Sequence, residues 1–336
     1  MKLGSFLRRA RCIILFGGIS VGAQVFAQSD PLPSWNDGPA KQAIISLVKD
    51  TTTQGNPKFV DPVARIATFD QDGTTWVEQP SYAQAMFAFH QVGVMAATDP
   101  KLKDTEPFKT VLSGDRAAIA KLTLPELEKI LAVTHTGMTM EAFRKSVQDW
   151  IATAQDPRFH RLYTDLVYLP MLEVMQYLRA NGYRTFIVTG GGQEFVRAYA
   201  ERIYGIPPEQ VVGSTAEVAF GYDKNGKSVL TKVPQGMRAN DKAGKPVGIE
   251  LVIGRRPVAA FGNSTGDQQM LEYTQDGGGA RLMMLVHHDD QTREYVYGPE
   301  SSIGTFSDDL MAEAKQRGWV VISMKNDWKR IFLWDH

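Results

Sequence analysis

Two aspartates separated by a single residue, Asp70 and Asp72, follow a short apolar segment and precede Gly73. Because alternate residues of an extended chain point to the same side, both carboxylates can face one ligand. Two carboxylates this close repel each other as anions, so the pair implies a bound cation or a raised pKa. Such a pair suits covalent phosphoryl transfer, in which one carboxylate attacks phosphorus and the other protonates the leaving alcohol and later activates water. The alternative is a plain Asp-x-Asp-Gly turn, which the motif alone would favour.

Three further segments carry groups that suit a phosphate or a divalent cation. Thr189 is followed by three glycines, which offer a hydroxyl and backbone N–H groups to an anion. Lys245 precedes Pro246, a residue suited to the first turn of a helix, and its ammonium can hold phosphate as a point charge. Asn263 and Asp267 provide the hard oxygen ligands that Mg²⁺ prefers. Each segment also has a structural alternative: a glycine-rich turn, a solvated lysine, and the N-cap of a following helix.

Short apolar segments that alternate with helical patterns indicate a parallel sheet covered by helices on both faces. The expected strands are 65–69, 184–188, 258–261, 281–287 and 319–324. The expected helices around them are 40–48, 169–181, 194–203, 246–253 and 268–273. Asp70, Thr189 and Asn263 follow these strands directly or within two residues. In open α/β sheets ligands bind beyond the carboxyl ends of the strands, so these residues are expected to form one site.

Residues from about 80 to 165 have an almost entirely helical pattern, with helices expected at 82–95, 124–134 and 140–153. This block follows the first polar segment and has the pattern of an inserted helical cap. Residues 211–229 favour a β-hairpin, with its turn at 224–227.

The chain resembles the haloacid dehalogenase superfamily in four motifs that occur in the superfamily's order. They are Asp70-Gln71-Asp72-Gly73-Thr74, Thr189-Gly190-Gly191, Lys245, and Gly262-Asn263-Ser264-Thr265-Gly266-Asp267. The similarity is closest to the phosphoserine-phosphatase-like branch and covers roughly residues 65 to 290. It implies a Rossmann-like, three-layer α/β/α core with a parallel sheet, formed by residues 28–78 and 166–336, and an inserted helical cap over residues 79–165.

The resemblance also implies a role for each matching residue. Asp70 would be the nucleophile that forms an aspartyl-phosphate, and Asp72 the general acid and base. Thr189, with Gly190, would bind the phosphoryl group, and Lys245 would stabilise its charge. Mg²⁺ would be held by Asp70, the backbone carbonyl of Asp72, and Asp267. An aspartate at position 72 is typical of the phosphatases of this superfamily and not of its dehalogenases.

Two positions depart from that pattern or leave it open. Asn263 stands where phosphoserine phosphatases usually have a carboxylate, which removes a charge from the surroundings of the metal. The amide is still an oxygen donor, and Asn263 is expected to contribute to substrate binding. Lys242 lies close enough in sequence to compete with Lys245 for the lysine role.

Histidines and aromatic residues near these motifs suggest other functions. His287 and His288 are adjacent on an expected strand and therefore point to opposite faces, so we do not expect them to bind one metal ion. They are expected near the rim of the site. Trp76, Tyr82 and Phe87 are more typical of core than of a ligand pocket. If they faced the cleft, they would suit a quaternary ammonium such as phosphocholine.

The first residues have the pattern of a secretory signal peptide. Four basic residues precede an apolar run, and small residues before position 28 predict cleavage after Ala27. Removal of four of the 37 basic residues leaves 33 against 37 acidic residues, and also removes Cys12, the one cysteine. A mildly acidic chain argues against nucleic acid or an anionic membrane as partner. We expect a periplasmic or secreted protein that is not membrane-bound after cleavage and is not stabilised by disulfides.

The sequence therefore predicts an exported, magnesium-dependent phosphomonoesterase of small organic phosphates, whose substrates are phosphocholine-like, phosphoserine-like or not narrowly specified. A phosphate-ester-binding protein with little turnover and a phosphotransferase are the alternatives. The partner is then a small phosphomonoester. Its identity, the export route and the oligomeric state are not encoded in readable patterns.

Overall fold

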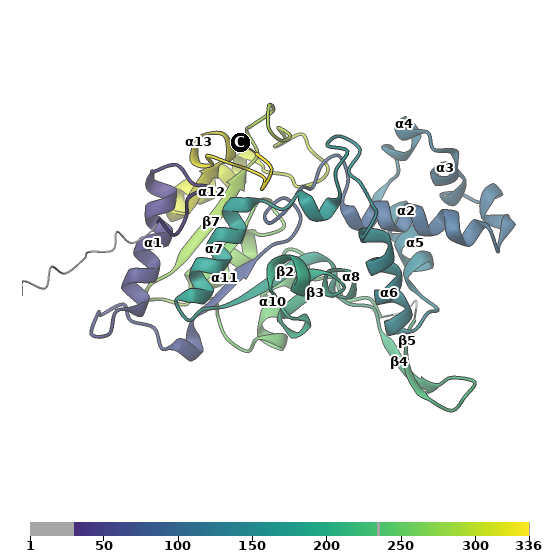
Figure 1. Cartoon of the computed structure of the whole chain (residues 1–336), viewed down its shortest axis with the longest axis horizontal. Coiled ribbons are helices and arrows are strands. Elements are labelled where there is room, and N and C mark those ends of the chain that lie inside the picture. Colours follow the sequence, from purple (N-terminus) through teal and green to yellow (C-terminus); the bar gives the residue numbers. More distant parts are fainter. Residues whose placement is uncertain (1–29, 234–235, 336) are drawn as a thin grey trace, which may run out of the picture. The chain divides into compact units, whose positions relative to one another are not determined.

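A parallel sheet of six strands forms the centre of the computed structural model, which describes residues 30–233 and 236–335 (Figure 1). The strand order is β3-β2-β1-β6-β7-β8, and every neighbouring pair is parallel. The strands are β1 Ile66–Phe69, β2 Arg184–Gly192, β3 Val211–Ser214, β6 Ala259–Gly262, β7 Leu282–His287 and β8 Val320–Ser323. The expected signal peptide, residues 1–27, lies outside the described residues.

Alternate side chains of the strands enter two different apolar layers. Phe69 and Ile187 pack in a layer with helices α1 Pro39–Thr52 and α7 Leu169–Ala180. Phe186 and Val188 pack in the other layer, with the helices α10 Gly244–Val252, α11 Gln268–Gln275 and α12 Asp308–Arg317. Because both faces of the sheet are buried, the strands are apolar throughout rather than alternating. The predicted Rossmann-like α/β/α core is confirmed.

The segment between β1 and β2 is helical. Its helices are α2 Ala83–Ala96, α3 Phe108–Ser113, α4 Arg116–Ile119, α5 Leu124–His135 and α6 Met140–Ile151 (Figure 1). Part of this segment has an apolar cluster of its own, which includes Val92, Phe108 and Ile130. Helices α2, α5 and α6 agree with those expected within one or two residues, whereas α3 and α4 were not predicted. The assignment of residues 79–165 as a cap domain stays a prediction.

Two segments differ from the expected pattern. The helix expected at 194–203 is divided into α8 Gln193–Arg197 and α9 Ala200–Tyr204. The hairpin expected at 211–229 includes β3, which instead joins the main sheet, because its Val211, Val212 and Gly213 are all buried. The hairpin itself consists of β4 Val218–Tyr222 and β5 Ser228–Lys232, around the expected turn. Strand β2 also continues through the glycines to Gly192, with a change of register after Val188.

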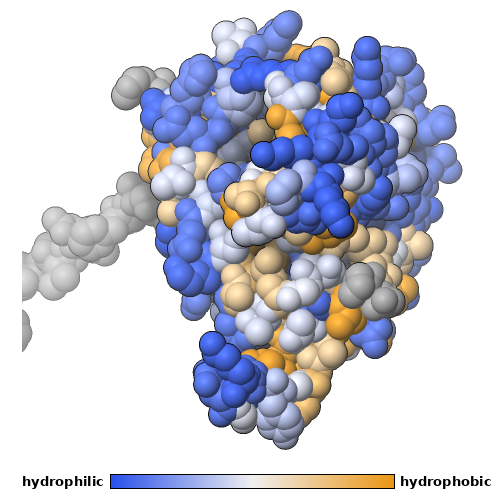
Figure 2. Space-filling view, turned by 90° about the vertical axis from the view of Figure 1, so that its right-hand side faces the viewer, coloured by the Kyte–Doolittle hydropathy of each residue, from blue (hydrophilic) through white to orange (hydrophobic). Residues whose placement is uncertain are grey.

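The hairpin β4–β5 is largely exposed to solvent. Phe220 and Tyr222 on β4 have exposed fractions of 66% and 70%. Figure 2 shows the molecule from the side to which the hairpin extends, and apolar surface is visible in its lower part. The remaining short helices are α13 Met324–Asp327 and the 3₁₀ segments Pro62–Ala64, Pro100–Asp104, Tyr163–Asp165 and Pro208–Gln210. Among the described residues, no helix combines the length and apolar character needed to cross a membrane.

Candidate active site

The site lies at the carboxyl ends of β1, β2 and β6. Phe69 of β1 is in register with Ile187 of β2 and Phe261 of β6, and the Phe69 and Phe261 rings stack at 4.4 Å. The backbone N–H of Asp70 donates to the Phe261 carbonyl at 2.9 Å, so pairing of the strands continues to the first catalytic candidate. The sheet register therefore brings together segments that are far apart in sequence.

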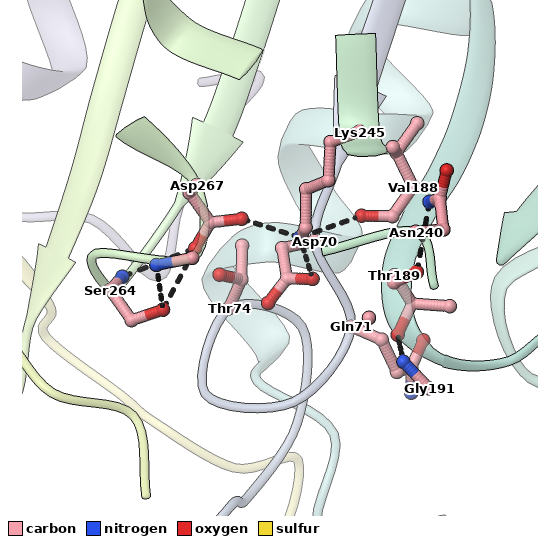
Figure 3. A network of polar contacts seen from close by, with 12 residues as sticks. Asp70, Gln71, Thr74, Val188, Thr189, Gly191, Asn240, Lys245, Ser264 and Asp267 are labelled. Atoms are coloured by element: carbon pink, nitrogen blue, oxygen red, sulfur yellow. Dashed lines mark hydrogen bonds and ion pairs between the residues drawn. The ribbon is translucent and has the colours of Figure 1, made fainter. Parts of the chain in front are cut away.

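Lys245 connects the three strand ends (Figure 3). Its ammonium donates to Asp70 Oδ1 at 2.5 Å, to Asp267 Oδ1 at 2.6 Å and to the Val188 carbonyl at 2.9 Å. All three N–H donors of the ammonium are thus engaged, and the side chain is 2% exposed. Burial alone would lower the pKa of Lys245, but the carboxylates of Asp267 and Asp70 outweigh it and raise the pKa above its ordinary value. Lys245 therefore stays charged and holds both carboxylates.

Lys242, the alternative lysine, does not reach Asp70. It is exposed, has a left-handed backbone with φ 49°, and its N–H donates to the Gly266 carbonyl at 3.1 Å. Lys242 shapes the loop before α10, and Lys245 on the first turn of that helix enters the site.

The two aspartates of the first motif have different surroundings. Burial and the charge of Asp267 raise the pKa of Asp70 well above its usual value, although Lys245 acts in the opposite direction. Burial raises the pKa of Asp72 to about 6, against the hydrogen bond that Trp76 Nε1 donates to Asp72 Oδ1 at 2.8 Å. Asp72 can therefore gain and lose a proton near neutral pH, as a general acid and base must.

Asp267 is held by the backbone of its own loop. Its Oδ2 accepts hydrogen bonds from the N–H groups of Asn263 and Ser264 at 3.0 and 3.1 Å. A Cβ atom at Gly262 would lie 2.5 Å from the Asp267 side chain, so only glycine allows this approach. The side chain does not cap α11, which was the structural alternative for this residue.

Asn263 connects two of the motifs. It is fully buried; its Oδ1 accepts a hydrogen bond from Thr74 Oγ1 at 3.2 Å, and its Nδ2 donates to Glu78 Oε2 at 3.0 Å. Both ends of the amide make hydrogen bonds within the protein, so Asn263 joins the first and fourth motifs. Its contribution to substrate binding stays a prediction.

The glycine-rich end of β2 lies beside these carboxylates. Thr189 is buried and its Oγ1 accepts a hydrogen bond from the Gly191 N–H at 2.9 Å, whereas Gly190 is exposed. A Cβ atom placed on Gly191 would be 3.2 Å from Thr189 Oγ1 and 3.9 Å from Asp72 Oδ2. Thr189, Gly191 and Asp72 therefore lie around the same small region.

Glu78 belongs to the site, although nothing in the sequence pattern identifies it as a site residue. It is 3% exposed, and its Oε2 accepts hydrogen bonds from Asn263 Nδ2 and from the Tyr297 hydroxyl at 2.8 Å. Burial and the charge of Asp72 raise the pKa of Glu78 well above its usual value. A Cβ atom on Gly73 would lie 2.6 Å from Glu78 Oε2, so the glycine of the first motif leaves room for this carboxylate.

His288 supports the first motif from the end of β7. Its Nε2 donates to the Gly73 carbonyl at 2.7 Å, and its Nδ1 lies 3.0 Å from Glu294 Oε2. A carbonyl can only accept, so Nε2 carries hydrogen in this network. His288 is 2% exposed and Glu294 is fully buried. His287 points elsewhere, toward the Phe306 ring at 4.9 Å. The histidines thus diverge as expected, and His288 lies beneath the loop rather than at the rim.

The carboxylates of the site suit a divalent cation. Asp70, Glu78 and Asp267 are buried and Asp72 is half-buried, and the buried ammonium of Lys245 contacts two of these carboxylates. Burial is the main cause of the raised pKa values of Asp70, Asp72 and Glu78, and neighbouring carboxylates add to it at Asp70 and Glu78. A bound cation would favour the ionised form of each group. In residues 30–233 and 236–335 no three acidic, histidine or cysteine side chains form a ready cluster for a metal. The expected ligand set needs only two carboxylates and one backbone carbonyl.

Solved structures similar to this chain share little sequence with it. A conserved protein of unknown function from Anaerococcus prevotii DSM 20548 is 14% identical, with 87% of this chain and 94% of that chain covered and a TM-score of 0.55. A protein of unknown function from Bordetella pertussis Tohama I is 17% identical, with coverage of 77% and 98% and a TM-score of 0.47. A phosphoserine phosphohydrolase-like protein from Francisella tularensis subsp. tularensis SCHU S4 is 15% identical, with coverage of 77% and 94% and a TM-score of 0.40. The first of these likenesses supports the fold, and the fold alone.

The sequence itself matches a known family over most of the described core. No curated protein matches the chain. Residues 67–272, however, match the family model described as haloacid dehalogenase-like hydrolase. The match extends over more than half of the chain and includes Lys245 and the three other segments that carry the motifs. The chain therefore belongs to the haloacid dehalogenase-like hydrolases, as its motifs predict.

Proposed function

We propose that this protein is an exported, magnesium-dependent phosphomonoesterase that hydrolyses small organic phosphates through an aspartyl-phosphate on Asp70. The observation that carries the proposal is the position of Lys245 between Asp70 and Asp267. Of the two carboxylate oxygens of Asp70, Lys245 binds Oδ1. No described residue donates a hydrogen bond to the other oxygen, Oδ2. One oxygen of this carboxylate is thus fixed while the other is available to attack phosphorus.

The first chemical step would use four groups around the phosphate. Asp70 Oδ2 attacks phosphorus, a bond forms between them, and the bond from phosphorus to the alcohol oxygen breaks. Asp72, protonated at this stage, gives its proton to the departing alcohol. The Thr189 hydroxyl and the exposed backbone of Gly190 would receive the phosphoryl oxygens.

The second step releases phosphate. Asp72, now a carboxylate, takes a proton from water as the water attacks phosphorus, and the bond to Asp70 breaks to give inorganic phosphate. Bound Mg²⁺, held by Asp70, Asp267 and the Asp72 carbonyl, would offset the phosphate charge so that an anionic nucleophile can approach. A pKa of about 6 for Asp72 supports both proton transfers.

The test is hydrolysis of p-nitrophenyl phosphate by the purified chain, with EDTA and after return of Mg²⁺. We expect activity that EDTA abolishes and Mg²⁺ restores. Asp70→Asn should abolish turnover while the protein stays folded, and Asp61→Asn, at an exposed site away from the strand ends, is the matched control. Turnover by Asp70→Asn equal to that of Asp61→Asn would exclude the aspartyl-phosphate mechanism.

The site bears differently on the two alternatives. A binding protein without turnover was suggested by the missing carboxylate at Asn263, but Glu78 supplies a carboxylate in contact with that amide. A phosphotransferase would use the same aspartyl-phosphate. Added glycerol separates the two cases, because transfer yields a new phosphate ester and hydrolysis yields only inorganic phosphate.

Export rests on the pattern of residues 1–27. Expression of the full chain, followed by cell fractionation and N-terminal sequencing, tests it. We expect an extracytoplasmic protein that begins at Gln28, and an Ala27→Arg variant that remains uncleaved. An active protein that retains Met1 in the cytoplasm would contradict this part of the proposal.

A further inference from the structure

A lysine near the glycine-rich end of β2 is buried without a charged partner. Lys232, the last residue of β5, is 8% exposed, and its Nζ lies 3.7 Å from the centroid of the Phe143 ring. No described carboxylate or carbonyl accepts a hydrogen bond from this ammonium. Its backbone is fixed on both sides, because Lys232 N–H donates to the Met138 carbonyl at 3.1 Å and Gly137 N–H donates to the Lys232 carbonyl at 2.9 Å. An unpartnered buried ammonium is costly unless a ligand completes its surroundings.

Glu194, the carboxylate whose charge acts on Lys232, is already paired with other cations. Glu194 on α8 accepts hydrogen bonds from Arg144 Nε at 2.8 Å and from Arg197 Nη1 at 2.7 Å. Two guanidinium groups therefore already balance this one carboxylate. Burial lowers the pKa of Lys232 to about 8 despite Glu194, so the side chain is still mostly protonated at neutral pH.

A histidine beside Lys232 brings no charge of its own. Burial, followed by the charge of Lys232, lowers the pKa of His135 to about 3. The Gln84 amide nitrogen lies 3.2 Å from His135 Nε2, and the Thr134 hydroxyl lies 2.8 Å from His135 Nδ1. Because an amide nitrogen can only donate, Nε2 accepts and His135 is neutral. Of the two basic side chains Lys232 and His135, Lys232 is thus the one that carries a positive charge.

Gln84 connects this group to the catalytic region. Its Oε1 accepts a hydrogen bond from the Gly192 N–H at 2.7 Å, while its amide nitrogen keeps one hydrogen free for a ligand. A Cβ atom at Gly191 would lie 3.1 Å from Gln84 Oε1 and 3.9 Å from Asp72 Oδ2. An alcohol that Asp72 protonates must leave on this side of the phosphate. The rest of the substrate would therefore extend toward Gln84 and Lys232.

We propose that Lys232 and the Gln84 amide form a subsite for an anionic group on the alcohol part of the substrate. The preferred substrates are then phosphomonoesters that carry a second negative charge, such as a carboxylate. This inference rests on the proposed phosphatase function. The carboxylates of Asp70, Asp72 and Glu78 would repel such a substrate, and the ammonium of Lys232 offsets that repulsion.

The same arrangement disfavours a quaternary ammonium substrate. Trp76 and Phe87 are buried, with exposed fractions of 0% and 1%, and they pack against other rings instead of lining a pocket. The face of Phe143 is already covered by the cation of Lys232. A choline group would meet a positive charge at the position where an aromatic ring would have to receive it.

The experiment compares 3-phosphoglycerate with glycerol 3-phosphate, which differ by a carboxylate in place of a hydroxymethyl group. We expect the wild-type kcat/KM to be at least about 10-fold higher for the carboxylate, as charge-assisted recognition requires. Lys232→Met should bring the ratio of the two kcat/KM values close to one, mainly by raising KM for 3-phosphoglycerate. Lys232→Arg should keep most of the preference for 3-phosphoglycerate. Lys227→Met, at an exposed lysine of the same hairpin, is the matched control. A wild-type ratio near one, or an equal loss on both esters in Lys232→Met, would overturn the proposal.

Binding to an inactive variant separates this subsite from the phosphatase function. Calorimetry on Asp70→Asn, with and without Lys232→Met, measures both esters without turnover. If the wild type hydrolysed no phosphomonoester, the proposed function would fail, while a preference for 3-phosphoglycerate that depends on Lys232 would still support the subsite. Equal affinity for both esters, or no binding of either, would reject it. Unfolding temperatures of the variants exclude misfolding as the cause.

Discussion

The imidazole of His288 is a bridge between the Gly73 carbonyl, 2.7 Å from Nε2, and the buried carboxylate of Glu294, 3.0 Å from Nδ1. Its ring stacks on Tyr297 with centroids 4.2 Å apart, and the Tyr297 hydroxyl donates to Glu78. The loop that carries Asp70 and Asp72 is therefore held in place by the segment after β7. His288 touches no group that we expect to react, so it acts by positioning.

His288→Gln should test this positioning. A glutamine can still donate to the Gly73 carbonyl but leaves Glu294 without the imidazole. We expect kcat to fall about 10-fold with little change in KM, and the free energy of unfolding to fall by about 1–3 kcal/mol, the cost of an unsatisfied buried polar group. Steady-state kinetics and urea unfolding measure the two effects. His287→Gln is the control and should change stability by no more than about 0.5 kcal/mol. Equal effects of both substitutions would rule out a special role for His288.

Lys245→Met and Lys242→Met form a matched pair of neighbouring lysines. Loss of the Lys245 ammonium leaves Asp70 and Asp267 facing each other in a buried site. We expect a loss of activity and a destabilisation of about 3–5 kcal/mol at neutral pH, the range for one broken partner of a buried ion pair. Lys242→Met, at an exposed site, should change the free energy of unfolding by less than about 0.5 kcal/mol. Similar behaviour of both variants would contradict the assignment of Lys245.

The pH dependence of Lys245→Met has a definite sign. Without the ammonium, the folded-state pKa of Asp70, which is already well above its usual value, rises further above that of the unfolded chain. The folded variant then binds more protons than the unfolded chain, so its stability increases as the pH falls. The difference in unfolding free energy between Lys245→Met and wild type should therefore shrink from pH 7 toward pH 5. Urea unfolding at a series of pH values checks this, and a constant difference would show that packing rather than charge is lost.

The sequence predicts a site residue when the residue lies in the same short segment as the strand that positions it. Asp70, Thr189 and Asp267 satisfy this condition, because a buried apolar strand and a polar loop are readable within a few residues. The sheet register then brings them together. Lys245 was predicted with Lys242 as a competitor, since which of two neighbouring lysines faces inward depends on the exact start of α10.

The supporting residues were not predicted because their contacts join distant segments. Tyr297 and Glu78 are 219 positions apart, and His288 and Gly73 are 215 positions apart. No local pattern indicates such pairs. The error at residues 211–229 has a related cause, because a short apolar run before a turn fits both a hairpin strand and a strand of the main sheet. Burial within the folded core decides between them.

The pKa of Asp72, raised to about 6, predicts the pH dependence of catalysis. Asp72 must be protonated to release the alcohol, so kcat/KM for an alkyl phosphate should fall about tenfold per pH unit above pH 6 once Asp72 is ionised. p-Nitrophenyl phosphate, whose phenolate needs no proton to leave, should show a shallower decrease. Asp72→Asn should lower kcat by about 10²–10⁴-fold and remove that difference between the esters. Identical pH profiles for both esters in the wild type would argue against proton donation by Asp72.

His135 predicts a loss of stability in acid. Its pKa in the folded protein is lowered to about 3 from an ordinary value of 6.5, mainly by burial. Below pH 6.5 the unfolded chain binds a proton that folded His135 does not, so the free energy of unfolding falls as the pH falls from 6.5 toward 3. The slope from one such group is at most about 1.4 kcal/mol per pH unit.

Urea unfolding of His135→Gln between pH 4 and 6 measures this contribution. Glutamine keeps an acceptor for Gln84 but does not titrate, so the pH slope of stability should be smaller than in the wild type by about 1 kcal/mol per pH unit. His90→Gln, at an exposed histidine of α2, should leave the slope unchanged. If His135→Gln and wild type lost stability in parallel over this range, His135 would have to be protonated in the folded protein. The inference that His135 brings no charge to the surroundings of Lys232 would then be wrong, because a second buried cation would lie beside that lysine.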